Sequence, residues 1–539
     1  MNETYKQEIK NESRERLIKH AINSLTSDRL DSYLVSKEHF EKITEHFHSM
    51  LYCTRQWHDL DFETKNSYNW LFFGGKANWL EFYDTICKPK SVNELKVLYL
   101  SGPEPNNDID VLCSNGIRIE NIWAIESDKS TYDKAINSLI ESGVQIKIHR
   151  GSLAEFFELT NHEFDIIYFD ACSPLLSSQQ SPLETLKQIF LHKRLSGLSA
   201  LITNFSEPGS NYNWNEMLAA WFATRDSICV PEVDGEFGGI PEKNQFYPAY
   251  CENINSHMDS YYDKFLTSFI PALGSEIIPM WQFTSLGSVQ SNHLLNEQLL
   301  SKELKYIREY KGDIKNVRDL IFNVPHYLLS IDSYPLLNWA RIIKEQFPKN
   351  HVLNSFLDSN RKKMSIENAL YIGALLKRFE EGDTELKTFI YDICGTKLKD
   401  TLINLDFFDR HMHLTCDIPM KNLFIELLIG LYGHPYIAHA GKNLSLKYRA
   451  KETWMYSDVF IFDQCRYLYD FLPTIDLWES FFQNWAKQVI VRGCIDGIRR
   501  NHFHMNTELF KWGFIEGVHG NEFGQAILAD RINLNEKPE

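Results

Sequence analysis

Five strand-like apolar runs alternate with helical patterns between Lys96 and Pro208, and this alternation constrains the fold more than any other feature of the chain. The runs are KVLYLSG at 96–102, NIWAIES at 121–127, VQIKIHRGS at 144–152, FDIIYFD at 164–170 and LSALITNF at 198–205. Strand–helix–strand spacing of this kind predicts right-handed crossovers and a parallel sheet. The predicted fold class is therefore α/β, with a mostly parallel sheet.

Each of the first four runs carries a carboxylate or a glycine turn at or just after its C-terminal end. Ser101-Gly102 turns the chain after the first strand, and Glu126 ends the second. Gly151-Ser152-Leu153 follows the third strand, and Asp170 ends the fourth. Ligands bind at this edge in open parallel sheets, so these residues are the candidate site.

The chemistry of these residue types suits a nucleotide-like ligand, although each has a plainer interpretation. Gly102 would let the backbone pass close to a ligand or would only form a turn, and Asp108 or Asn107 could cap the following helix. Glu126 could accept hydrogen bonds from ribose hydroxyls, or be a solvated carboxylate or a helix cap. Ser152 could contact an adenine or simply cap the helix that starts near Leu153. Asp170 could cap the segment that follows it.

In the order of these residues the stretch resembles the class I S-adenosylmethionine-dependent methyltransferases. The resemblance implies a Rossmann-like sheet and S-adenosyl-L-methionine as the cofactor. It places the cofactor against the following residues: Ser101, Gly102 and Glu104 at its methionine part, Glu126 and Ser127 at its ribose, Gly151, Ser152 and Leu153 at its adenine, and Asp170 at the methyl group. It also implies that Asp170 is the catalytic, acceptor-facing residue.

The stretch departs from the family pattern in its loops. The first loop, at 101–106, holds one glycine and two prolines where the family has several glycines. The segment after Asp170 lacks the Asn/Asp-Pro-Pro-aromatic signature with which amino-methylating enzymes hold a flipped base. We therefore expect a methyltransferase with an unidentified acceptor that is not nucleic acid. The alternative is a non-catalytic member of the fold that acts in protein assembly.

Length and composition set the wider expectations. A chain of 539 residues exceeds one hydrophobic core, and three parts are predicted: a helical N-terminal region at 1–93, the α/β domain at 94–287 and a helical C-terminal region at 288–539. The net charge of −16 argues against a surface that coats nucleic acid. The polar N-terminus, the absence of a membrane-length apolar run and ten scattered cysteines favour a cytoplasmic protein without disulfides or membrane contact.

Several segments outside the α/β stretch carry their own predictions. The run Ser275–Gly287 is strand-like, and the block from Lys447 to Asn535 is expected to be helical. Within that block, charged and aromatic residues interleave at 447–470, which indicates a buried, ion-paired core or a binding groove. The basic run Arg361-Lys362-Lys363 is expected at a solvated helix end. Histidines at 411, 413, 502 and 504 are interpreted as ordinary residues, and no metal site is predicted.

Overall fold

The computed structural model describes residues 8–42, 44–45, 76–178, 181–209, 214–222, 254–285, 335–361, 364–370, 429–471 and 531–536, with isolated stretches of one to three residues at 58–66, 232–237 and 491–498. The histidines at 411, 413, 502 and 504 lie outside the described residues, as do Lys362 and Lys363.

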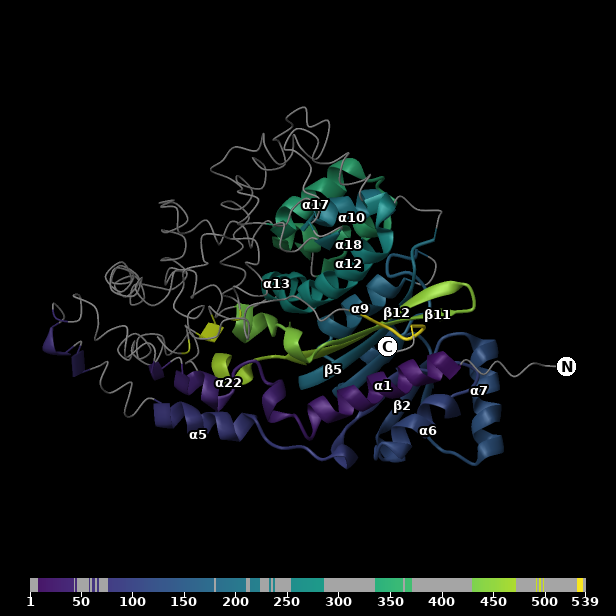
Figure 1. Cartoon of the computed structure of the whole chain (residues 1–539), viewed down its shortest axis with the longest axis horizontal. Coiled ribbons are helices and arrows are strands. Elements are labelled where there is room, and N and C mark those ends of the chain that lie inside the picture. The colour runs from purple at the N-terminus through teal and green to yellow at the C-terminus, as the bar shows by residue number, and fades with distance from the viewer. Residues whose placement is uncertain are drawn as a thin grey trace.

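A nine-stranded sheet forms the centre of the described structure (Figure 1). Its strands are β1 (Val97–Leu100), β2 (Ile122–Glu126), β3 (Lys147–Arg150), β4 (Phe164–Asp170), β5 (Leu195–Ser206), β10 (Ile437–Ala438), β11 (Leu444–Ala450), β12 (Thr453–Asp463) and β13 (Ile532–Asn533). All five strands predicted between 96 and 205 are present. The central strands β1, β2 and β4 are buried over nearly their whole length, which explains their continuous apolar sequences.

The strand order is β13-β11-β12-β5-β4-β1-β2-β3, with β10 paired to β12. Strands β1 to β5 run parallel to one another, as predicted. Strand β12 runs antiparallel to β5 along a nine-residue register in which Met455 lies opposite Ser206 and Asp463 opposite Leu198. Strand β11 pairs antiparallel with β12 and so returns to the direction of β5.

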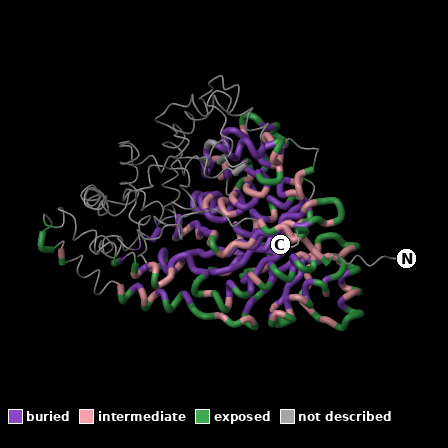
Figure 2. The backbone as a smooth tube through the Cα atoms, in the orientation of Figure 1, coloured by how far each residue is buried: buried purple, intermediate pink, exposed green. Residues whose placement is uncertain are grey.

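Helices cover both faces of the sheet (Figure 1). On one face lie α1 (Glu8–Leu25), α6 (Asn106–Ser114) and α7 (Lys129–Ser142), and α1 contacts β5, β11, β12 and α6. The other face carries α8 (Leu153–Leu159), α9 (Pro182–Leu191), α12 (Met258–Ala272) and α13 (Ile278–Ser285). Both layers bury their sheet-facing sides (Figure 2).

Further helices extend these layers. Helices α10 (Trp214–Phe222), α17 (Pro335–Gln346) and α18 (Val352–Asp358) lie beyond α12, where the buried Trp221 and Trp339 rings meet edge to face. A two-residue hairpin, β8 (Asn360–Arg361) and β9 (Met364–Ser365), follows α18. Two short strands, β6 (Glu232–Val233) and β7 (Glu236–Phe237), pair with each other. Helix α5 (Lys76–Ile86) contacts α22 (Arg466–Tyr469), which follows β12.

Several local predictions were wrong. The run at 275–287 is helical rather than a strand, because π-helical residues 273–277 lead into α13. Every residue of α13 is buried, and a uniformly buried helix shows no periodicity to separate it from a strand. Helix α6 begins after Pro105, so neither Asn107 nor Asp108 is its cap.

The block from 447 to 535 differs from its helical prediction in most of its described part, which forms most of β11 and all of β12 and β13, with the short helix α22 between β12 and β13. Of the charged residues at 447–470, Asp458 and Asp463 are buried in the core, whereas Arg449, Lys451 and Glu452 are exposed, so the core interpretation holds for part of the tract. Arg531 pairs with Asp458 at 2.8 Å and with Asp263 at 2.6 Å. Asp463 accepts hydrogen bonds from the backbone of Leu34 and from Tyr467. Among the described helices, none is both long and apolar enough to span a membrane.

Candidate functional site

The ends of β1 and β2 lie side by side at the carboxyl edge of the sheet. The Ser101 backbone N–H donates to the Ile125 carbonyl at 2.8 Å and thereby extends the pairing of the two strands by one residue. Gly102 follows, and a Cβ added to it would meet no atom within 4 Å, so there is open space beside this turn. Glu104 is exposed further along the same loop, where it accepts a hydrogen bond from Asn107.

Glu126 closes β2 at the same edge. Its Oε1 accepts a hydrogen bond from the Asp128 backbone N–H at 2.8 Å, which fixes the carboxylate over the turn. Asp128 in turn caps α7 by accepting from the Thr131 backbone, so Glu126 is not the cap of that helix. Partial burial raises the pKa of Glu126 above its ordinary value. Ser127 is exposed between the two acids.

The turn after β3 is held by a helix cap. The Gly151 N–H donates to the Glu126 carbonyl at 3.0 Å, so this turn lies beside the end of β2. Ser152 accepts from the Glu155 backbone, and Glu155 accepts from the Ser152 backbone, forming a capping box for α8. The capping interpretation of Ser152 is thus confirmed, and Leu153 is a buried first residue of the helix.

Asp170 lies at the centre of a polar network at the end of β4. Its Oδ1 accepts hydrogen bonds from Asn204 at 2.7 Å and from the Cys172 thiol at 2.8 Å, and its Oδ2 pairs with Lys10 at 3.1 Å. Burial alone would raise the pKa of Asp170, but Lys10 and these hydrogen bonds outweigh burial and lower it. Asp170 is therefore a carboxylate anion, and its side chain is only 15% exposed.

Helix α1 supplies two cations that sequence reasoning missed. Four residues beyond Lys10, one turn along the helix, Arg14 pairs with Asp108 of α6 at 2.6 Å, and both side chains are about nine-tenths buried. The helical spacing of Lys10 and Arg14 was visible in the sequence, but nothing there shows that α1 crosses the sheet at this edge.

The two ion pairs influence each other. Burial raises the pKa of Asp108 to about 6, because it outweighs the favourable charge of Arg14, and the nearby Asp170 anion adds to the rise. Burial and Asp170 together raise the pKa of the Cys172 thiol to about 12, so this thiol is not an activated nucleophile. Two cations and two carboxylates thus face one another between α1 and the ends of β1 and β4.

The wall of the site opposite β1 comes from the C-terminal strands. Asn204 of β5 also donates to the Tyr448 hydroxyl at 3.2 Å, and its Oδ1 accepts from Ser457 at 2.7 Å. Tyr448 and Ser457 belong to β11 and β12, more than 240 residues beyond β5, so no local sequence signal connects them to Asp170. Within the described ranges no group of three or more His, Cys, Asp or Glu side chains is arranged to hold a metal ion.

No family model matches the chain. A magnesium-dependent glutamate N-prenyltransferase from Digenea simplex is 22% identical over 253 residues, which cover 41% of this chain and 56% of that enzyme. The chain therefore spans little more than half the length of this relative.

Solved methyltransferase structures are similar to parts of the chain. An S-adenosylmethionine-dependent methyltransferase from Clostridium acetobutylicum is 19% identical and covers 24% of this chain and 50% of its own, with a TM-score of 0.17. The plantazolicin methyltransferase BamL is 13% identical and covers 43% and 74%, with a TM-score of 0.19. The fold itself follows from the strand order of this chain.

The strands lie in the order β3-β2-β1-β4-β5-β12-β11, and β12 is the one strand of these that runs in the opposite direction. This arrangement is a class I methyltransferase-like, Rossmann-like fold.

Proposed function

We propose that the chain binds S-adenosyl-L-methionine at the carboxyl edge of its sheet and transfers the methyl group to an acceptor. The observation that carries this proposal is the charge arrangement at the ends of β1 and β4. Lys10 and Arg14 offer cations and Asp170 and Asp108 offer anions there. The amino-acid end of this cofactor is a zwitterion, and a site with both signs of charge is complementary to it.

The remaining edge residues fit the rest of such a ligand. Open space beside Gly102 allows a ligand to approach the backbone, and the half-buried Glu126 is positioned to accept hydrogen bonds from ribose hydroxyls. The turn at 151–153 lies one strand further along, where we place the adenine. The cofactor supplies an electrophilic methyl group on a sulfonium.

Asp170 has a defined place in this proposal. Its lowered pKa makes it a poor general base, because a base works best with a pKa near the operating pH. We assign it an electrostatic and positioning role beside the reacting groups, with Asn204 and Cys172 holding its orientation. Rate enhancement would then come chiefly from alignment of acceptor and methyl group.

Calorimetric titration of the full chain with S-adenosylmethionine and S-adenosylhomocysteine tests the proposal. We expect binding of both, weakened about tenfold or more in Glu126→Ala, because a charge-assisted hydrogen bond is lost. Glu141→Ala is the matched control, since it removes an exposed acid at the far end of α7 and should leave binding unchanged. Absence of heat at millimolar ligand would reject the cofactor site and favour the non-catalytic assembly role, and equal binding in Glu126→Ala would reject a cofactor site at this edge.

A further inference from the structure

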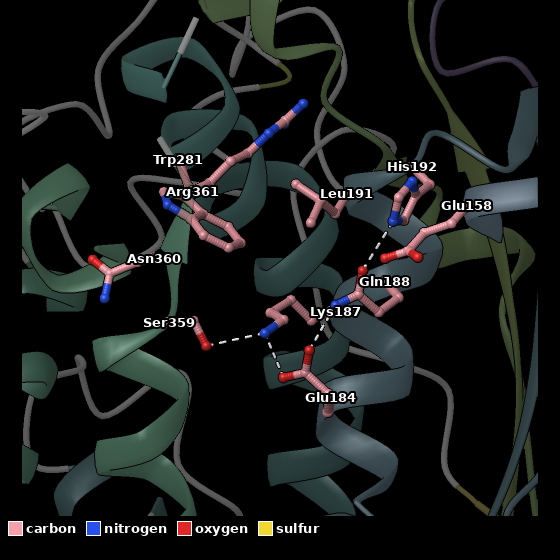
Figure 3. A pocket seen from close by; sticks show the side chains of 10 residues that line it. All are labelled: Glu158, Glu184, Lys187, Gln188, Leu191, His192, Trp281, Ser359, Asn360 and Arg361. Carbon is pink, nitrogen blue, oxygen red and sulfur yellow. Dashed lines mark hydrogen bonds and ion pairs between the residues drawn. The ribbon is translucent and has the colours of Figure 1, made fainter. Parts of the chain in front are cut away.

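A pocket lies against α9, on the side of that helix that does not face the sheet, and shares no residue with the candidate functional site (Figure 3). Its volume is about 460 Å³. One wall is formed by α9 and its C-terminal end, and the other by residues 359–361 at the start of the β8–β9 hairpin, with Trp281 of α13 between them. Segments far apart in sequence therefore build it.

Charges at one end of this pocket satisfy each other. Lys187 forms an ion pair with Glu184, donates to Ser359 at 3.0 Å and lies 5.7 Å from the centre of the Trp281 ring. Glu184 also accepts a hydrogen bond from Gln188 at 2.6 Å. Lys187 is only 5% exposed, and these contacts compensate its buried charge.

Among the residues that the structure describes, none compensates the charge at the other end. Arg361 extends away from Glu184 and Lys187 (Figure 3) and is half-buried, in contrast to its predicted place at a solvated helix end. Its guanidinium has no hydrogen-bond or ion-pair partner among the described residues. The same holds for the half-buried ammonium of Lys193, the second residue after α9.

Arg361 lines the pocket, whereas Lys193 does not line it but lies close enough to Arg361 for the two charges to interact. Burial, followed by the charges of Arg466 and Arg361, lowers the pKa of Lys193 to about 8. Burial, followed by Arg194 and Arg361, lowers the pKa of His192 on the pocket wall. Glu158 is the remaining carboxylate of the lining, and it is exposed and lies beyond ion-pair distance of Arg361. Half-buried cations that repel each other favour an added anion.

We propose that this pocket binds the oxyanion of a small molecule, a phosphate or a carboxylate, with Arg361 as its contact and the nearby charge of Lys193 adding to the attraction. A guanidinium presents a planar fork of N–H donors that matches both oxyanions and holds them by paired hydrogen bonds. The apolar surface of Leu191 lines the same pocket and would meet the organic part of the ligand. This site is independent of the proposed methyl transfer.

Calorimetric titration of the full chain with pyrophosphate and, separately, with malonate tests the site, in the absence of S-adenosylmethionine. We expect at least one of the two to bind, with Arg361→Gln weakening it about tenfold or more and Lys193→Gln weakening it less. Lys349→Gln is the matched control, because it removes an exposed lysine between α17 and α18 and should change nothing. Preference for pyrophosphate would identify a phosphate ligand, and preference for malonate a carboxylate.

A thermal-shift measurement distinguishes loss of anion binding from poor folding of a variant. The bound anion should raise the melting temperature of the parent chain and of Lys349→Gln, and raise it less in Arg361→Gln. Failure of both anions to bind at millimolar concentration, or equal binding in the parent and Arg361→Gln, would overturn the proposal. Neither result bears on S-adenosylmethionine binding, which is measured with different variants.

Discussion

Two carboxylates at the candidate site show how neighbouring residues of one type acquire different properties. Asp170 has a lysine and two hydrogen-bond donors, which lower its pKa despite burial. Asp108 is similarly buried but has Arg14 as its ion-pair partner and the Asp170 anion nearby, so burial dominates and its pKa rises to about 6. The sequence shows two acids near strand or helix ends, but the balance of burial and partners is a tertiary property.

We predict that Asp108 titrates near pH 6, as measured by the ¹³C shift of its carboxyl group. A raised pKa means that the folded state binds this proton more tightly than the unfolded state. The resulting stabilisation is complete below the unfolded value of 3.8 and disappears as the pH rises through about 6. The stability difference between the parent and Asp108→Asn should therefore vary with pH across this window. Titration of Asp108 near 3.8 would contradict the assigned burial.

At the scale of elements, α1 is the feature that sequence reasoning placed least well. It was predicted as part of a separate N-terminal region, yet it crosses β5, β11 and β12 and pairs with Asp108 and Asp170. Helical periodicity identifies the buried residues of α1, such as Leu17 and Ala21, but not the surface that buries them.

We predict that Arg14→Leu lowers the free energy of unfolding by about 3–5 kcal/mol, because it leaves Asp108 buried without its partner. Adding Asp108→Asn to Arg14→Leu should recover part of the loss, since the uncompensated charge is then removed. Urea denaturation of the two single variants and the double variant measures this coupling.

Arg16→Leu is the control for this cycle. Arg16 is 49% exposed and pairs with Glu12 on the outer side of the same helix, so its loss should cost no more than about 1 kcal/mol. Equal costs for Arg14→Leu and Arg16→Leu would mean that the Arg14–Asp108 pair does not anchor α1.

At the scale of the whole molecule, the sheet is completed by a distant part of the chain. Strands β11 and β12 lie in the region predicted as a helical C-terminal unit, yet β12 pairs with β5 from Leu198 to Ser206. The described residues on either side of the predicted boundary at 287 thus share one sheet and one core. That the regions 1–93, 94–287 and 288–539 fold as separate units remains a prediction.

We predict that a chain truncated after residue 287 does not fold into a soluble monomer. Removal of β11 and β12 would expose the backbone donors and acceptors of β5 and uncover its buried side chains. Size-exclusion chromatography with light scattering should show aggregates for residues 1–287 and a discrete species for the full chain. A monomeric fragment with cooperative unfolding would support the predicted boundary instead.

The sequence by itself determined the local architecture from β1 to β5, because buried parallel strands and their alternation with helices are encoded within a few residues of each position. It also located the carboxyl edge with Gly102, Glu126 and Asp170. Only the tertiary structure decided what surrounds that edge: Lys10 and Arg14 from α1, and Tyr448 and Ser457 from β11 and β12. Contacts between segments hundreds of residues apart depend on the packing of complete helices and strands, and a local sequence pattern does not predict them.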